Sequence, residues 1–248
     1  MKYLLFLILI CENYLSAANS IESSIPSLYD HNVWYVIFLG ISAVTFLWLR
    51  KIWHNLVPDI FYWIHFTIVC WSGIMYMNII FETPLKNFAY YADWIISTPL
   101  IMLAIGLTAM YPFKKISWSS IFGVIATQLM VIVTGILAQL CPTQIGKIAY
   151  FTIGNIFMLL IFYFIFGPFM QIAKENKIML QKYKVLAYFF TGFWLLYPLV
   201  WIIGTPGYQL ISPYFTSLLF VILPLFCKPV FGLIDIILLY YAHKQMKG

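Results

Sequence analysis

One lysine in this sequence stands where a charged side chain is costly. Lys228 lies in the middle of an apolar stretch that runs from Phe215 to Ala242. Burying an uncompensated ammonium group in a membrane is expensive, so this residue needs a partner carboxylate, a water-filled path or covalent use of its amine. An amine held in an apolar pocket is well suited to Schiff-base chemistry, and we expect this use here.

Three further ionisable residues fall at membrane depth, namely His65, Asp93 and Asp235. Asp235 lies seven residues, or roughly 10 Å, beyond Lys228 and on the same helical face. His65 falls at a similar depth in an earlier segment, so a His–Asp pair that holds or passes a proton near physiological pH is predicted. Asp93 lies nearer the opposite membrane surface and is the expected counterion of Lys228.

Each of these residues also has a purely structural reading. A lone intramembrane histidine such as His65 can cap a carbonyl or bridge two helices, and Asp235 can form a structural hydrogen bond near the interface. For Asp93 this reading is weak, because a buried charge without a counter-charge would shift its pKa and neutralise. Asp59, close to the end of its segment, is expected to reach the membrane interface.

The composition is typical of a polytopic membrane protein. Hydrophobic residues make up 63% and charged residues only 9% of the 248 residues, whereas soluble domains have roughly 25% charged residues. A membrane-spanning helix needs roughly 20 apolar residues. Seven such segments are predicted, at residues 33–50, 56–80, 87–111, 118–139, 147–170, 184–204 and 214–242. We therefore expect an all-α membrane protein, a seven-transmembrane-helix bundle within residues 19–248, in the plasma membrane as a multi-pass protein.

The two ends of the chain are predicted to lie on opposite sides of the membrane. In residues 1–18, Lys2 precedes an apolar run, and Ser16–Ala18 offers a cleavage site, so this segment reads as a secretory signal peptide or else as an uncleaved N-terminal extension. Ten of the fourteen basic residues fall in loops on one side: Arg50, Lys51, Lys114, Lys115, Lys174, Lys177, Lys182, Lys184, Lys244 and Lys247. This positive-inside bias predicts an external N-terminus and a cytoplasmic C-terminus. It also accounts for the net charge of +6 without a nucleic-acid partner.

Soluble-enzyme chemistry is disfavoured by what the sequence lacks. The four cysteines show no metal-binding spacing, and two of them lie within membrane segments. We found no glycine-rich phosphate loop and no nucleophile elbow. The sequence therefore favours an ion transporter over an enzyme and predicts no metal site.

An aromatic face accompanies the ionisable residues. Trp194, Tyr197 and Trp201 follow one another at helical spacing and share one face. Pro198 lies beside them and predicts a kink, and Trp94 follows the expected counterion directly. A flat conjugated ligand tethered to the buried lysine would be held between such rings.

The sequence resembles the microbial (type 1) rhodopsins. The resemblance rests on YYADWIISTPL in the third segment, FWLLYPLVWIIG in the sixth and FCKPVFGLID in the seventh, and it extends over residues 33–242. It implies all-trans retinal bound as a protonated Schiff base on Lys228, with Asp93 at the counterion position, and a homotrimer by family analogy. It also implies further residues of the retinal pocket: Trp94, Thr98, Met130, Tyr150, Trp194, Tyr197, Pro198, Trp201, Pro224 and Cys227.

Departures from the family pattern indicate a subgroup. Outward proton pumps of the family have an arginine, a second counterion aspartate and a carboxylate proton donor where this chain has Tyr90, Pro224 and Ala104. Losing the arginine and one aspartate removes one charge of each sign, so a pocket with Asp93 and a protonated imine stays neutral. The triplet Asp93, Ser97 and Ala104, together with the proline and the histidine–aspartate pair, resembles the xenorhodopsins, which are light-driven inward proton pumps.

The resemblance implies a direction of transport. Light isomerises retinal, the imine proton moves to the histidine–aspartate pair and then to the inner water, and an external proton returns along the half lined by Tyr90 and Asp93. Ser72 and Ser97 are expected hydroxyl supports near the imine, although a bond to the helix backbone fits each equally well. A photosensory rhodopsin that signals to a transducer and a channel are the alternatives. Sensors usually keep the arginine that Tyr90 replaces.

Overall fold

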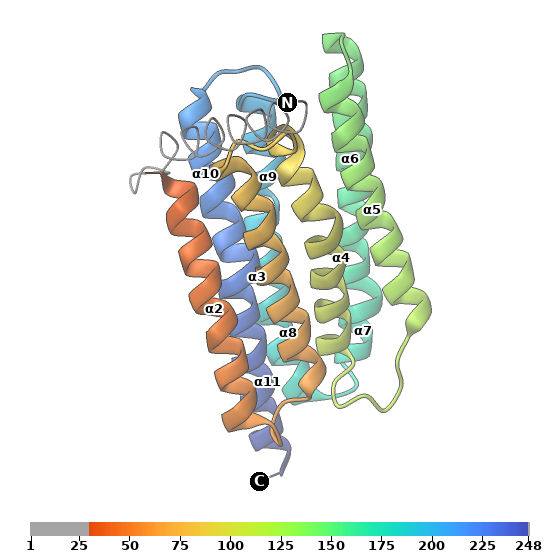
Figure 1. Cartoon of the computed structure of the whole chain (residues 1–248). Coiled ribbons are helices and arrows are strands. Elements are labelled where there is room, and N and C mark those ends of the chain that lie inside the picture. The colour runs from red at the N-terminus through yellow and green to blue at the C-terminus, as the bar shows by residue number, and fades with distance from the viewer. Residues whose placement is uncertain (1–29, 248) are drawn as a thin grey trace, which may run out of the picture.

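The computed structural model describes residues 30–247, and every regular element in that range is a helix (Figure 1). Seven spans are long and apolar enough to cross a membrane. They are His31–Trp53, Asp59–Ile80, Lys86–Ala109, Trp118–Leu140, Gln144–Ala173, Lys177–Ile203 and Pro213–Lys247. The predicted all-α, seven-helix bundle is therefore confirmed. The predicted signal peptide, residues 1–18, lies outside the described residues.

Several spans consist of more than one helical element. The elements are α2 (His31–Trp53), α3 (Asp59–Ile80), the 3₁₀ turn η1 (Lys86–Phe88), α4 (Ala89–Ala109), α5 (Trp118–Leu140), α6 (Gln144–Phe164), the π-helical η2 (Ile165–Phe169), α7 (Met170–Ala173), α8 (Lys177–Trp194), α9 (Leu196–Ile203), α10 (Pro213–Leu225), the π-helical η3 (Phe226–Val230) and α11 (Phe231–Lys247).

Polar side chains mark where several helices begin. Each accepts a hydrogen bond from a backbone N–H of the first turn, which otherwise has no partner. Such a cap typically stabilises a helix by about 1 kcal/mol. The capping residues are Asp30 before α2, Thr143 before α6, Asn176 before α8 and Ser212 before α10.

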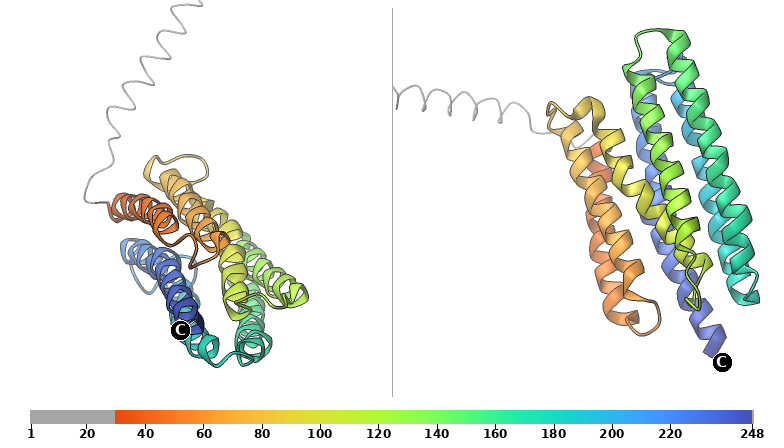
Figure 2. Two further views of the ribbon diagram at one scale, coloured as in Figure 1. Left: turned by 90° about the horizontal axis from the view of Figure 1, so that it is seen from below. Right: turned by 90° about the vertical axis from the view of Figure 1, so that its right-hand side faces the viewer.

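Successive spans run antiparallel, and α2 packs on α3, α3 on α4, α5 on α6 and α8 on α11 (Figures 1 and 2). The α2–α3, α4–α5 and α7–α8 connections lie at the same end of the bundle as the end of α11. We call this the basic end. It carries the basic residues Arg50, Lys51, Lys114, Lys115, Lys174, Lys177, Lys244 and Lys247.

Two spans contain a π-helical turn that the regular apolar segments did not predict. Segment η2 contains Pro168 and η3 contains Pro229, and a proline cannot donate the backbone hydrogen bond that a regular helix requires. The sixth span is interrupted at Leu195, between α8 and α9, close to the kink predicted at Pro198. Segment η3 contains the buried Lys228. Since π-helical turns occur often at functional sites, this turn marks the lysine as a candidate functional residue.

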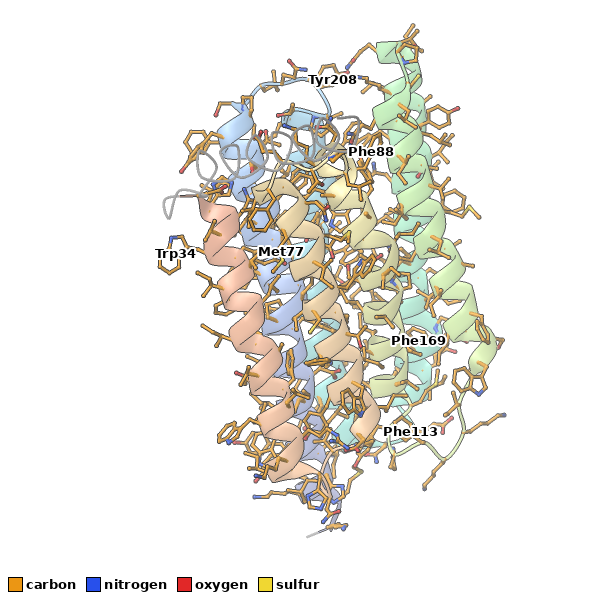
Figure 3. The ribbon with its side chains drawn as sticks, in the orientation of Figure 1. Trp34, Met77, Phe88, Phe113, Phe169 and Tyr208 are labelled. Atoms are coloured by element: carbon orange, nitrogen blue, oxygen red, sulfur yellow. The ribbon has the colours of Figure 1, made fainter. Side chains whose placement is uncertain are left out.

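The bundle has a packed interior and an apolar outer surface. Phe169 and Phe231 are fully buried, whereas Trp34, Ile41 and Trp48 on α2 are exposed. Figure 3 shows Trp34 projecting away from the bundle and Phe169 close to α4. A hydrocarbon environment requires helices whose backbone hydrogen bonds are all formed within the protein. The exposed apolar side chains fit the same environment.

Candidate functional site

Lys228 lies at the centre of the bundle and is only 2% exposed. It belongs to η3. Its Nζ atom forms an ion pair with Asp93 Oδ2 of α4 and donates a hydrogen bond to Ser72 Oγ of α3 at 3.1 Å. Removing one partner of a buried ion pair typically costs about 3–5 kcal/mol. The carboxylate is therefore what stabilises a positive charge on this nitrogen.

The carboxylate of Asp93 is completely buried. Its Oδ2 atom also accepts a hydrogen bond from Ser72 Oγ at 3.1 Å, and Tyr35 OH lies 3.2 Å from the same serine oxygen. Three helices thus contribute to one polar cluster around the lysine nitrogen. Sequence reasoning missed Tyr35, because a tyrosine is an ordinary residue in an apolar helix and carries no charge to mark it.

His65 and Asp235 form a second buried pair, nearer the basic end. His65 Nε2 lies 2.9 Å from Asp235 Oδ2, and both side chains are almost fully excluded from solvent. Thr108 Oγ1 of α4 donates a hydrogen bond to Asp235 Oδ1 at 2.6 Å. The structure therefore brings together the predicted His–Asp pair and adds a hydroxyl that the sequence reasoning did not include.

A glycine makes room for this pair. A Cβ atom on Gly232 would lie 2.8 Å from His65 Cγ and 2.9 Å from Phe46 Cζ, closer than real Cβ contacts. The ring centroids of Phe46 and Phe231 each lie 5.7 Å from the centroid of the imidazole. The imidazole orientation is therefore fixed by packing as well as by the aspartate.

Beside Lys228 lies a largely apolar cavity, part of which opens to the outside of the bundle. Aromatic rings form its walls: Trp94 and Tyr197 meet edge to face with centroids 5.7 Å apart, and Phe151 stacks on Trp201 at 4.8 Å. The predicted pocket residues in its wall are Trp94, Thr98, Tyr150, Trp194, Tyr197, Pro198, Trp201 and Cys227. The aromatic face that the sequence predicted thus surrounds the lysine.

Two predicted pocket residues do not line this cavity. The side chain of Met130 is 48% exposed on the outer surface of α5, while Val131 and Gly135 of the same helix face the cavity. The prediction for Met130 was wrong, because this residue lies on the outward face of α5, one position before the inward-facing Val131. Pro224 is buried one turn before Lys228, at the end of α10, and does not reach the cavity wall.

Gln128 is a cavity residue that the sequence analysis missed. It is fully buried on α5, and its Nε2 donates a hydrogen bond to Thr98 Oγ1 at 2.9 Å. Thr98 in turn donates to the backbone oxygen of Trp94 at 2.7 Å. A lone glutamine in an apolar segment was a usable signal, since uncharged polar groups also need partners in a membrane.

The remaining predicted site residues serve the backbone or lie further away. Ser97 Oγ donates to the backbone oxygen of Asp93 at 2.8 Å, which is the structural use expected as one of its two alternatives. Tyr90 OH lies 3.4 Å from Ser217 Oγ, and its ring packs against Tyr76. Asp59 is exposed at the basic end and pairs with Arg50 at 2.5 Å, as its expected interface position requires.

Comparison with known proteins identifies the family. The sequence profile of the family described as "Bacteriorhodopsin-like protein" matches residues 28–245. Bacteriorhodopsin-I of Haloquadratum walsbyi is 31% identical over 189 residues, which are 70% of this chain and 72% of that protein. Sensory rhodopsin-2 of Natronomonas pharaonis is 31% identical over 146 residues, 58% of each protein. The solved structure of the inward proton pump xenorhodopsin superposes with a TM-score of 0.79 at 36% identity, over 86% of this chain and 93% of that one.

The family profile covers nearly all of the seven spans and both buried pairs. The family binds retinal as its chromophore, and its members are light-driven ion pumps or photosensors rather than enzymes. The chain therefore belongs to the bacteriorhodopsin-like family, as a xenorhodopsin-like microbial rhodopsin embedded in the plasma membrane by seven helices.

Proposed function

We propose that this protein is a light-driven inward proton pump whose basic end lies in the cytoplasm and whose N-terminus lies outside. The orientation rests on the positive-inside bias of the loops. The direction rests on one observation above all: the buried His65–Asp235 pair lies between Lys228 and the basic end. The similarity to a xenorhodopsin that pumps protons inward supports the same direction.

We propose that retinal occupies the aromatic cavity and is attached to Lys228 Nζ. The fit is good, because the cavity has one buried amine in its wall, a mainly apolar lining and stacked aromatic rings that suit a flat conjugated chain. When bound there, retinal would supply light absorption and a double-bond isomerisation that reorients the proton on this nitrogen. Asp93 then supplies the counter-charge, and Ser72, which Tyr35 contacts, orients its carboxylate.

The inner half of the bundle supplies a proton acceptor. The His65–Asp235 pair can take up a proton from Lys228 Nζ, and either the imidazole or the carboxylate can carry it. Asp235 lies roughly 10 Å along the helix from the lysine, so bridging water must carry the proton between them. Thr108 holds Oδ1 of the aspartate, which leaves its Oδ2 directed at the imidazole.

The residues that outward pumping would need are replaced. Ala104, fully buried on α4, cannot return a proton to the lysine nitrogen from the inner side. Tyr90 and Pro224 carry no charge, so Asp93 is left as the carboxylate that faces Lys228 among residues 30–247. A proton for the nitrogen is then taken from the outer half, past Tyr90 and Asp93.

A photosensor is the second candidate function, favoured by the similarity to sensory rhodopsin-2 of Natronomonas pharaonis. Photocurrents recorded over a range of membrane potentials distinguish it from a pump and from a channel. An inward pump gives a steady inward proton current that does not reverse near zero potential. A channel current reverses with the driving force, and a sensor gives no steady current.

We further propose, by analogy with the family, that the seven-helix domain of residues 19–248 assembles as a homotrimer, and that residues 1–18 are a cleaved signal peptide. The mass of the detergent-solubilised pigment tests the first proposal. The N-terminal sequence of the mature protein tests the second, because an uncleaved extension would leave Met1 or Lys2 at the start.

A further inference from the structure

A second pair that contains a histidine, His243 with Tyr111, lies nearer the basic end than the His65–Asp235 pair. His243 of α11 places its Nδ1 atom 2.8 Å from the hydroxyl of Tyr111, two residues beyond the end of α4. The side chain of His243 is half-buried, and its Nε2 atom has no exposed surface and no hydrogen-bond partner within residues 30–247. His243 is therefore a titratable group that lies beyond Asp235 along α11, toward the basic end.

The two pairs repeat one arrangement, because each joins α11 to the chain at or just beyond the end of α4. Asp235 of α11 meets Thr108 near the end of α4, and His243 meets Tyr111 about one turn further on. Asp235 and His243 are eight residues, or roughly 12 Å, apart and share one helical face. Leu239 lies midway on that face and is fully buried. The apolar side chain of Leu239 therefore lies between two groups that can each bind a proton, Asp235 and His243.

Tyr111, which contacts His243, also lines a second cavity at the basic end. The wall of this cavity includes Lys114, Lys115 and Glu175, so water can enter it from that end. Burial raises the pKa of Tyr111 above its ordinary value. Its hydroxyl therefore stays protonated and can only relay a proton, whereas the histidine can hold one.

We propose that His243, held by Tyr111, is the residue from which the transported proton leaves for the cytoplasm after it has passed the His65–Asp235 pair. This inference rests on the proposed inward pumping. The imidazole accepts a proton that bridging water brings past Leu239 and becomes an imidazolium. It then gives its Nδ1 proton to the Tyr111 oxygen while the tyrosine's own proton passes to water in the cavity. Both residues are then neutral again.

The test separates proton transfer inside the protein from release into solution. In His243→Gln the amide can still bond to Tyr111 but cannot be protonated at neutral pH. After a flash, optical absorption should report loss of the proton from Lys228 Nζ with unchanged timing. A pH-sensitive dye at the cytoplasmic face should report release slowed about a hundredfold or more, the lower end of what a positioned proton-transfer group contributes. A transient infrared imidazolium band should be reduced.

His54→Gln is the matched control, because His54 is exposed at the same end of the bundle; its release should keep wild-type timing. Tyr111→Phe keeps the ring that packs on Phe113 but removes the hydroxyl, and it should slow release in the same direction. If His243→Gln forms no pigment, the Tyr111→Phe variant decides. Release with wild-type timing in the variants that form pigment overturns the role of His243 and leaves inward pumping intact. Absence of cytoplasmic release in the wild type instead contradicts the proposed function.

Discussion

Lys228 and Asp235 lie seven residues apart on the last span, yet each is paired with a different helix. The lysine pairs with Asp93 of α4, and the aspartate pairs with His65 of α3. In the proposed mechanism, the last span therefore carries both the group that gives up a proton and a group that can receive it. Because this span also contains the π-helical turn η3, the angle about the helix axis between these two side chains differs from that in a regular α-helix.

Replacing Lys228 with alanine should abolish covalent pigment formation, because no other amine lines the aromatic cavity among the described residues. The measurement is visible absorption after addition of all-trans retinal. Lys86→Ala is the control, since Lys86 is exposed and lies 3.7 Å from Glu82 at the opposite end from the basic end. A covalent pigment in Lys228→Ala would exclude this attachment site.

Asp235→Asn should slow inward transport by about a hundredfold or more while the pigment remains coloured. The amide keeps the size of the side chain and can still bond to Thr108 and His65, but it cannot accept the transported proton. Light-driven pH change per pigment molecule measures the effect. Asp59→Asn, which alters an exposed carboxylate at the basic end, should pump normally. Unaltered pumping by Asp235→Asn would exclude Asp235 as an essential acceptor.

Gly232→Ala should destabilise the protein by about 1–3 kcal/mol, because its methyl group would overlap with His65 and Phe46. Displacement of the imidazole should also slow transport. Thermal loss of pigment colour measures the stability. Gly40→Ala is the matched control, since a Cβ atom on Gly40 meets nothing within 4 Å, and a helical alanine there should be neutral or stabilising. Equal effects of the two substitutions would argue against close packing at His65.

The two predicted serines should behave differently when changed to alanine. Ser72 bonds to both Lys228 and Asp93, and hydrogen bonds to charged groups contribute about 1.5–3 kcal/mol. Ser72→Ala should therefore lower pigment stability by that amount and shift the absorption maximum. Ser97 bonds to a backbone oxygen, so Ser97→Ala should cost about 1 kcal/mol or less and leave the colour unchanged. A larger colour shift in Ser97→Ala than in Ser72→Ala would show that Ser97, rather than Ser72, interacts with the charged pair.

The seven spans and the two buried pairs could be predicted from the sequence. Charged groups are costly in an apolar segment, so the few that lie at membrane depth must pair with one another. Asp93 opposite Lys228, and His65 near Asp235, followed from depth and helical periodicity. These arguments use only rise per residue and the cost of burying charge.

The details that depend on neighbouring helices could not be predicted in this way. The π-helical turn at Phe226–Val230 depends on backbone packing around Pro229. The hydroxyls of Tyr35 and Thr108 are uncharged, so nothing in the sequence assigned them to Ser72 and Asp235. A rotation of one residue about the helix axis separates an inward position from an outward one, as the exposed Met130 and the cavity-lining Val131 of α5 show.

The sign of the light-driven pH change tests the central claim most directly. Cells that express the protein are illuminated in weakly buffered medium, with and without a protonophore. Inward pumping predicts that the medium becomes alkaline in the light and that the protonophore abolishes the change. Acidification of the medium, or no pH change from a pigment that absorbs normally, would contradict inward transport through the His65–Asp235 pair.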